Sequence, residues 1–493
     1  MGKKMLLVVP HQDDEIFVGG GLLRIFSKSK DYEVHVVFTT NGDFFPSEGE
    51  IRLRESLRVL TKLYVIPEKN ISFLGYGDGW QGGKHLYNLQ RTQMTTSICG
   101  RRETYGITEH EDYRWIKSGR HSVYCRDNFK ADMKELMSDI MADIIIAVDY
   151  DKHPDHKAAS LMAEECIGEL LKEHPNYRPI VLKRYAYDGV WKGKADFFDL
   201  PRKRTILSQF EEAPYLEEDK ICIGMPAECS TPYLRHNFLY IAAKCYKTQE
   251  VWQKADEIIN IDEVYWRRNT NNLLYEAELK ASSGQVEFIR DFKLYDCDDI
   301  MKKQFVMKQC AWLPVVSDHD RRIHIHFNHP QTIEQINIYA LGNPSKDRLS
   351  GEFVLDNGVR LFTGNICLNG KKNKFTLERQ SNIINIDFYI TDCVGNPAGI
   401  TEMEILPQRD GSVPEELQKF VFREDSFEFN TVHKLGMQIE RTMFSLKRKL
   451  YRWFPNEFFL KRYYPELGKK RQWLFIYRIK FVWERVNSKF GNP

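Results

Sequence analysis

The sequence predicts an α/β fold with a doubly wound, mostly parallel sheet, followed by an antiparallel β-sandwich and a basic helical tail. In the first third, short apolar runs alternate with helical periodicity, which is typical of repeated βα units. Between about residues 285 and 407 the helical period gives way to short alternating runs separated by turn residues. Because 493 residues are too many for one ordinary core, we expect domains at 1–280, 285–407 and 415–493.

The N-terminal region begins with two βα units. Met5–Val9 is a short apolar run ending at a proline, as in a strand buried on both faces. Apolar residues at helical spacing predict a helix over Glu15–Phe26. The β-branched run Glu33–Thr40 predicts a second strand, and leucines three and four apart predict a second helix over Arg52–Tyr64.

Further strand and helix signals continue the same sheet. Ile71–Leu74 predicts a third strand, Ile144–Val148 a further buried strand, and His156–Leu171 the helix after it. Such units favour a parallel sheet with right-handed crossovers. The polar and aromatic stretch 80–140 is interpreted as an insertion, either a lid or acceptor-binding loop or a surface excursion.

The second region contains regularly spaced short runs, which predict an antiparallel sandwich. They are Arg322–Phe327, Ile333–Tyr339, Gly351–Leu355, Ile383–Ile390 and Glu402–Leu406. The pattern resembles the galactose-binding-like β-sandwiches of the discoidin type. That resemblance implies a carbohydrate-binding module, and a purely structural sandwich is the alternative.

Charge is unevenly distributed along the chain. The net charge is +2, but residues 434–489 contain 15 Lys and Arg against four acids and so carry +11, which leaves −9 for the rest. The acidic remainder argues against a nucleic-acid partner. Aromatic residues alternating with cations in 434–493 favour contact with an anionic membrane surface. A helical arm packing on its own domains or on a second subunit is the alternative.

Cysteine usage and the first residues bear on the compartment. The ten cysteines form no C-x-x-C pair, which fits isolated thiols in a reducing compartment. The apolar run near Met1 is too short for a signal peptide, and no run of 18 apolar residues predicts a spanning helix. We therefore expect a cytoplasmic protein, held peripherally at the inner face of the cell membrane by its tail.

Two clusters of metal-ligand residue types each follow a predicted buried strand. His11, Asp13 and Asp14 come after the first strand, and His153-Pro154-Asp155-His156 comes after the 144–148 strand. Ligands of such sheets bind at the carboxyl ends of the strands, so the clusters are expected to meet at one edge. Either cluster alone would be read as a solvated turn or helix cap. One histidine and one aspartate from the first cluster, with one histidine from the second, make the ligand set of a catalytic zinc site.

At these residues the chain resembles the PIG-L/LmbE-like family of metal-dependent de-N-acetylases. Residues 10–15 (Pro-His-Gln-Asp-Asp-Glu) are similar to the family's (P/A)-H-P-D-D-E motif, and 153–156 match its H-P-D-H motif. Weaker similarities, such as Arg52 with Glu55 and the element at 244–249, extend the resemblance over about residues 1–275. Gln12 stands where the family usually has proline, a departure that removes no ligand. The family fold is Rossmann-like.

The resemblance also implies roles for individual residues. The implied metal ligands are His11, Asp14 and His156, the general base is Asp13, the acid and oxyanion stabiliser is His153, and the sugar contacts are Arg52 and Asp78. Zn²⁺ is the expected ion, although His and Asp ligands also suit Fe²⁺. A catalytic tyrosine of some members corresponds to Asp151 here, with Tyr150 beside it, so no tyrosine role is assigned.

The expected function is therefore that of a zinc-dependent N-deacetylase, a hydrolase of carbon–nitrogen bonds other than peptide bonds. Its expected substrate is an N-acetylated amino sugar in a lipid-linked or polysaccharide-pathway glycan. Two alternatives are a glycan-binding protein with a vestigial catalytic fold and a hydrolase of small N-acyl metabolites.

Overall fold

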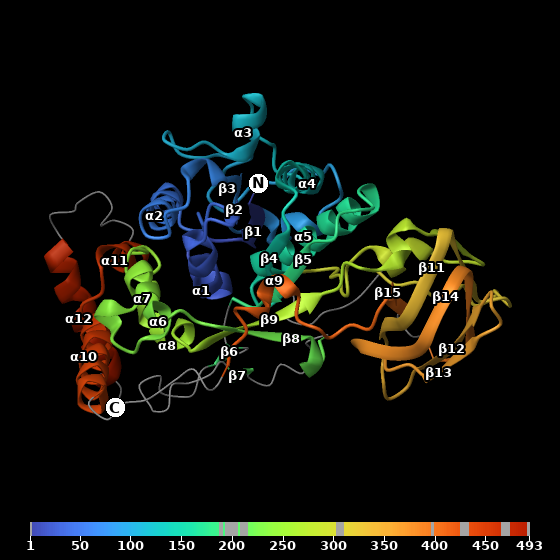
Figure 1. Ribbon diagram of the computed structural model, residues 1–493. Coiled ribbons are helices and arrows are strands. Elements are labelled where there is room, and N and C mark those ends of the chain that lie inside the picture. The colour runs from blue at the N-terminus through green and yellow to red at the C-terminus, as the bar shows by residue number, and fades with distance from the viewer. Residues whose placement is uncertain are drawn as a thin grey trace.

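The computed structural model describes residues 2–186, 191–192, 206–207, 215–301, 310–395, 399–423, 433–464 and 474–490. Parts of the predicted tail, at 424–432, 465–473 and 491–493, lie outside the described residues. Figure 1 shows a central sheet covered by helices, with a second sheet at one end of the molecule and the tail helices at the other.

The predicted mostly parallel sheet is confirmed. It has seven strands in the order β3-β2-β1-β4-β5-β9-β8. The parallel strands are β1 (Lys3–Val9), β2 (Tyr32–Thr40), β3 (Ile71–Tyr76), β4 (Ile144–Val148) and β5 (Ile180–Arg184). Two antiparallel strands, β8 (Lys220–Gly224) and β9 (Asp262–Arg268), complete one edge. The chain builds outward from β1 on one side and from β4 on the other, so a topological switch point lies between these two strands.

Helices on both faces bury the alternating side chains of the sheet. Met5, Leu7 and Val9 of β1 share one core with α1 (Asp14–Lys28) and α2 (Gly49–Lys62). Leu6 and Val8 point to the other face, toward α4 (Arg126–Ile140) and α5 (Pro154–Glu173). Both faces of β1 are therefore dry, which explains its uninterrupted apolar sequence. The shorter elements are α3 (Tyr113–Ser118), α6 (Ala227–Ser230), α7 (Phe238–Ala243), α8 (Ala255–Ile258), β6 (Trp191–Lys192) and β7 (Ile206–Leu207).

The interpretation of residues 80–140 as one insertion is wrong at its C-terminal end. Arg126–Ile140 is α4, and Phe129, Met133 and Leu136 on one of its faces are buried in the core that it shares with α5. Apolar residues at this helical spacing could have identified the helix. The excursion from the sheet therefore ends at about residue 125.

The second sheet is antiparallel and sandwich-like. Its strands are β10 (Glu278–Ala281), β11 (Arg322–Leu341), β12 (Arg348–Leu355), β13 (Arg360–Asn365), β14 (Asn369–Val394) and β15 (Gly399–Leu406). The order is β10-β11-β14-β12-β13, with β15 also paired to β11. The two short strands predicted within 322–339 are one continuous strand, because register shifts near Gln331 bend β11 without ending it. Apolar side chains of this sheet form a core separate from those of the first sheet.

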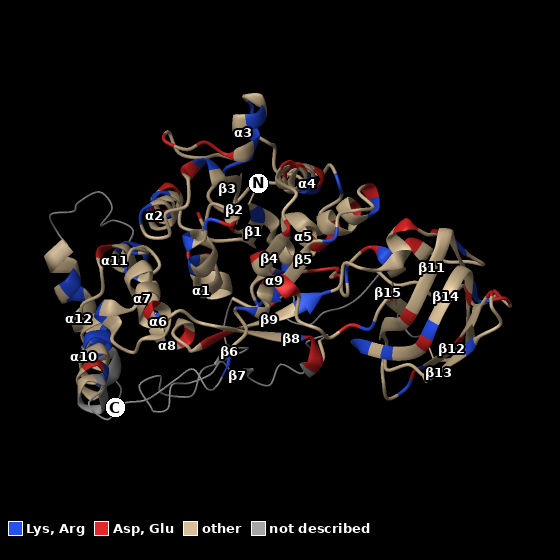
Figure 2. Ribbon diagram, in the orientation of Figure 1, with Lys and Arg blue, Asp and Glu red and all other residues tan. Residues whose placement is uncertain are grey.

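The predicted helical tail is confirmed for the described residues. It contains α9 (Glu415–Gln418), α10 (His433–Trp453), α11 (Glu457–Tyr463) and α12 (Leu474–Phe490). Lys and Arg are frequent on α10 and α12, at the end of the molecule away from the second sheet (Figure 2). Among the helices that the structure describes, none is long and apolar enough to cross a membrane.

A substitution in β4 tests whether the core of the central sheet stabilises the protein. Ile146 is fully buried, so Ile146→Ala removes apolar contacts and leaves a cavity. We expect the free energy of unfolding to fall by about 2–5 kcal/mol, measured by urea denaturation. Ile116→Ala is the control, because Ile116 is 61% exposed and its loss should change stability by no more than about 0.5 kcal/mol. Equal effects of the two changes would contradict this core.

Candidate active site

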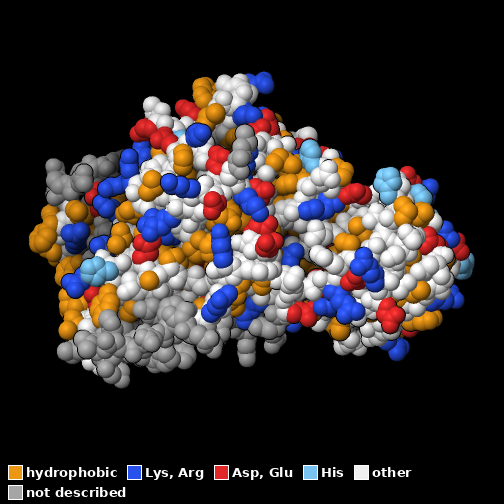
Figure 3. All heavy atoms as spheres, in the orientation of Figure 1, with side chains coloured by type: hydrophobic (Ala, Val, Ile, Leu, Met, Phe, Trp, Pro, Cys, Tyr) orange, Lys and Arg blue, Asp and Glu red, His pale blue; other side chains and the backbone are white. Residues whose placement is uncertain are grey.

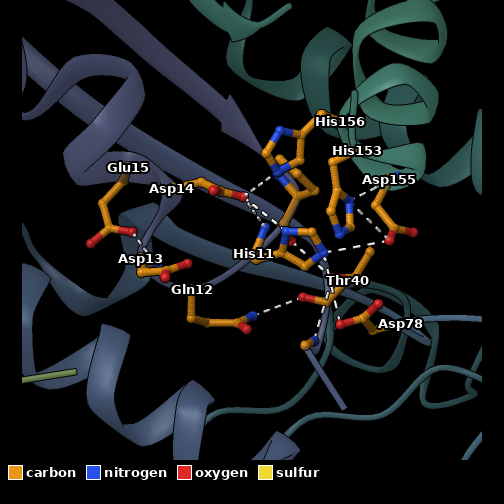
Figure 4. A network of polar contacts seen from close by, with 12 residues as sticks. His11, Gln12, Asp13, Asp14, Glu15, Thr40, Asp78, His153, Asp155 and His156 are labelled. Carbon is orange, nitrogen blue, oxygen red and sulfur yellow. Dashed lines mark hydrogen bonds and ion pairs between the residues drawn. The ribbon is translucent and has the colours of Figure 1, made fainter. Parts of the chain in front are cut away.

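The loops after β1 and β4 bring the two histidine-containing clusters together at the switch point (Figure 4). The His11 and His153 rings lie 4.8 Å apart, the His153 and His156 rings 4.7 Å, and the His11 and His156 rings 5.4 Å. His11 precedes α1, and His156 lies in the first turn of α5. The sheet order thus places residues 145 positions apart in one buried group.

Asp14 lies between two of these histidines. Its Oδ2 is 3.0 Å from His11 Nδ1 and 3.2 Å from His156 Nε2, and it also accepts the His11 backbone N–H. Its Oδ1 is buried and has no hydrogen-bond partner. Burial alone would raise the pKa of Asp14, but His156 and His11 outweigh it and hold the pKa well below its usual range. Asp14 is therefore an ionised carboxylate with an oxygen available to a ligand.

Asp151 fixes the orientation of His156. Its Oδ2 lies 2.7 Å from His156 Nδ1, so His156 Nε2 points to Asp14. Burial lowers the pKa of His156, but Asp151 and Asp14 together raise it to about 9. A carboxylate on one ring nitrogen is the usual partner of a metal-binding histidine. Sequence reasoning did not assign this role, although an acid five residues before His156 in the same loop was a usable signal.

The residues fit a divalent metal. In a tetrahedral site with ligand bonds near 2.0 Å, neighbouring ligand atoms are about 3.3 Å apart. The two contacts of Asp14 with His11 and His156 are close to that value. Nitrogen atoms of His11, His153 and His156 lie within 4.8 Å of one another, as do ligand atoms of His11, Asp78 and Asp155. A buried, unsatisfied carboxylate between two imidazoles is the arrangement that a cation would stabilise.

Asp13 has a strained backbone beside this group. Its φ of 127° and ψ of −26° are rare for a residue with a side chain. Glu15 Oε2 accepts the Asp13 N–H at 3.0 Å, and Arg52 Nη2 lies 3.5 Å from Asp13 Oδ1. Burial, reinforced by the charge of Asp14, raises the pKa of Asp13 to about 6. Strain at a buried carboxylate with raised proton affinity is typical of a functional position.

His153 is held in its neutral form. Its Nδ1 accepts the Asp155 backbone N–H at 3.3 Å, so the proton of the neutral ring is on Nε2. Burial, followed by the positive charge on His11, lowers the pKa of His153 to about 4. The sequence suggested a protonated His153, whereas this environment favours a neutral ring that can donate a hydrogen bond from Nε2.

The 81–125 segment contributes His85 to the site. His85 Nε2 lies 3.0 Å from Asp155 Oδ1, and His85 Nδ1 accepts the Tyr87 N–H at 3.0 Å. The proton of His85 is therefore on Nε2, where it is donated to Asp155. Asp155 also lies 3.5 Å from His11 Nε2. No sequence motif marks His85, because the contact depends on how the long loop folds back over the sheet edge.

Arg52 and Asp78 also lie at the site. Arg52 donates to the Gly42 carbonyl at 3.1 Å and to the Gln12 carbonyl at 3.2 Å, and so holds the first loop. Asp78 Oδ2 is 3.8 Å from His11 Nε2. Burial, followed by repulsion from Asp155, raises the pKa of Asp78 to about 7. Their contact with a sugar stays a prediction.

The late element at 244–249 contacts the α1 and α2 helices. The Tyr246 hydroxyl donates to Glu15, whose backbone follows the strained Asp13. Thr248 donates from its hydroxyl to Glu55 at 2.5 Å, and the Lys247 N–H donates to the same carboxylate at 2.9 Å. Gln12, the departure from the family motif, donates to the Thr40 carbonyl at 2.7 Å. These bonds fix both ends of the first loop.

Comparison with known proteins supports the family prediction for the N-terminal part. Residues 6–167 match the family described as PIG-L: GlcNAc-PI de-N-acetylase, and these residues form a PIG-L domain. No curated protein matches the chain.

Solved structures are similar to parts of the chain. A deacetylase–teicoplanin complex from the biosynthesis pathway of teicoplanin is 13% identical, with 54% of this chain and 97% of that chain covered and a TM-score of 0.30. CpGH89CBM32-6 produced by Clostridium perfringens is 18% identical, with 27% of this chain and 97% of that chain covered and a TM-score of 0.17. The family 32 CBM from C. perfringens NanJ in complex with galactose is 15% identical, with 27% of this chain and 95% of that chain covered and a TM-score of 0.20. The fold of this protein is defined by its own strand order.

The Asp151–His156 contact can be tested without removing a ligand. Asp151→Asn keeps the shape of the side chain but removes the charge that orients His156, so metal affinity should fall by about 10–100-fold. Competition with a chelating dye measures the change. Asp31→Asn, at an exposed turn, is the control and should bind metal as the native chain does. Unchanged affinity in Asp151→Asn would show that Asp151 has no such role.

Proposed function

We propose that this protein is a metal-dependent N-deacetylase that releases acetate from an N-acetylated amino sugar. The observation that carries the proposal is the buried Asp14 between His11 and His156, with the strained Asp13 beside it, inside a PIG-L domain. Deacetylases of this family supply the reaction class, and the contacts supply the roles of the residues.

His11, Asp14 and His156 would hold the metal, which we propose to be Zn²⁺, with Fe²⁺ suited to the same ligands. When bound, such an ion makes water acidic enough to act as a nucleophile near neutral pH and polarises the amide carbonyl. Asp151 keeps His156 turned toward Asp14. The ionised Asp14 offsets part of the charge of a cation.

Asp13 is the proposed general base. Its Oδ1 accepts no hydrogen bond, although Arg52 Nη2 lies 3.5 Å away, and its raised pKa makes it a stronger base than an ordinary aspartate. It takes a proton from the water that attacks the amide carbon. The carbon–nitrogen bond then breaks, the nitrogen gains a proton, and the products are acetate and a free amine.

His153 is the proposed oxyanion stabiliser. The neutral ring carries its proton on Nε2, and the Asp155 backbone N–H occupies Nδ1. From Nε2 it can donate a hydrogen bond to the oxygen that becomes negative. A neutral imidazole keeps this proton, so the leaving amine gains the proton that Asp13 took from water instead of one from His153. Loss of one such donor lowers a rate by about 10²–10³-fold. Asp78 and Arg52, at the wall of the site, are the proposed sugar contacts.

The proposed substrate is an N-acetylated amino sugar in a lipid-linked or polysaccharide-pathway glycan, handled on the cytoplasmic side of a membrane. The sandwich-like sheet is the proposed carbohydrate-binding module, in a division of the chain into 1–280, 285–407 and 415–493. A galactose complex among the similar structures supports a sugar ligand for that region only by analogy. The basic tail supports an anionic membrane surface as partner.

Substitutions at the site distinguish the proposed general base from the proposed metal ligands. Asp13→Ala should keep the metal but lower deacetylation by about 10²–10⁴-fold, because it removes a general base. His11→Ala and His156→Ala should each lose the metal, measured by elemental analysis after desalting. Asp31→Ala is the matched control and should keep both metal and activity. A near-native rate in Asp13→Ala would overturn the assignment of the base.

A substrate panel separates the proposed function from its alternatives. Acetate and free amine are measured after incubation with N-acetylated monosaccharides, nucleotide sugars, prenyl-linked sugars and small N-acyl metabolites. We expect release from at least one N-acetylated sugar and abolition of that release in His156→Ala. Release only from small N-acyl metabolites would contradict the sugar assignment. Glycan binding with no release from the metal-loaded protein would favour a vestigial catalytic fold.

A further inference from the structure

Helices α10 and α12 present apolar side chains to solvent. On α10 and at the residue after it, Ile439, Met443, Leu446, Leu450 and Phe454 recur at intervals of three or four residues, and each is about half exposed or more. On α12, Phe475, Ile479 and Trp483 recur every four residues, with Ile476 next to Phe475, and Trp483 is 65% exposed. Figure 3 shows apolar side chains gathered at this end of the molecule. We call these nine residues the tail face. Contiguous exposed apolar surface of this kind marks an interaction site.

Cations border the tail face. Arg441, Lys449 and Arg452 on α10 and Lys480 on α12 are exposed. The whole segment 434–489 carries +11. An apolar stripe flanked by Lys and Arg is the composition of a helix that lies in a membrane interface, with its cations near anionic head groups.

The helices that carry the tail face are fixed to the rest of the protein. The opposite side of α10 packs inward, where Phe444 and Tyr451 meet Trp252 at ring distances of 6.3 and 5.8 Å. Arg485 of α12 donates to the Arg452 carbonyl of α10 at 2.6 Å. One side of α10 thus forms core contacts while the other remains uncovered, so the exposed stripe is not the unburied core of a loose segment.

We propose that the tail face docks on an anionic lipid bilayer, with α10 and α12 lying in the plane of the interface. This inference is independent of the deacetylase chemistry. A second copy of the chain is the competing occupant, since the α10 spacing would also suit helix pairing. However, pairing would bring two strongly cationic borders together, and the few acids of the segment cannot compensate them. Charge complementarity therefore favours the lipid surface.

Docking at the tail face would also bring the active site close to the bilayer. Arg462 of α11 forms an ion pair with Glu48 and lies 4.6 Å over the Phe45 ring. The loop that contains Phe45 also contains Asp43, whose carboxylate accepts the Asp78 N–H at 2.8 Å. Phe44 and Phe45 are themselves partly exposed. The bilayer would thus lie next to the loop that forms one wall of the catalytic group.

Co-sedimentation of the full-length, metal-loaded protein with vesicles tests the proposal. One set of vesicles is pure phosphatidylcholine and the other contains one part in three of phosphatidylglycerol. We expect binding at least tenfold tighter to the anionic vesicles. Because the Debye length falls from about 10 Å at 0.1 M salt to about 3 Å at 1 M salt, binding should weaken strongly between these concentrations.

Variants identify the surface. Met443→Glu combined with Leu450→Glu changes two exposed residues and should lower vesicle binding at least tenfold, while soluble-substrate deacetylation and the circular dichroism spectrum stay native. Ile116→Glu combined with Val316→Glu changes two exposed residues outside the tail face and should leave binding intact. Asp13→Ala should also bind vesicles normally, so failure of the deacetylase assignment is distinguishable from failure of this one. Unchanged vesicle binding in the tail variant would overturn the proposal. So would a lipid-free dimer, seen by light scattering, that the tail variant dissociates.

Discussion

The carboxylate of Asp14, buried between His11 and His156, is the contact on which the account of the site depends. It exists because β1 and β4 are neighbours in the sheet, although residues 10–143 lie between them in the chain, and because a short loop leads from each strand into a helix. Two dry faces hold β1 in its register, so the loop that follows it has little freedom. The buried charge would be costly without its two histidine partners. The same geometry prepares the group for a cation.

Around that contact, other parts of the chain fix the histidines. Asp151 orients His156, while Asp155 occupies His153 Nδ1 through its backbone and accepts from His85. Arg52 and Gln12 hold the first loop against β2. The 81–125 segment therefore contributes to the site through His85. Burial is the main reason why the pKa of His153 is low, and the proposed donor is therefore a neutral ring and not an imidazolium.

Much of the fold could be predicted from the sequence, because the neighbouring strands β1 and β4 are buried on both faces and have apolar sequences. The metal-ligand clusters were visible for the same reason, since each follows one of these strands. Helix α4 was missed because its apolar residues are interrupted by charged ones and it follows a long polar segment. The continuity of β11 was also missed, because a bend with irregular register has the polar sequence of a turn. His85 was beyond reach, since its contact with Asp155 depends on tertiary folding over 70 residues.

Anomalous diffraction from crystals of the zinc-loaded protein tests the central claim most directly. Data collected on both sides of the zinc absorption edge locate the ion without reference to activity. The account predicts one strong peak within about 2.0–2.2 Å of ligand atoms from His11, Asp14 and His156. A peak bound instead by His11, Asp78 and Asp155, or no peak at the switch point, would contradict it.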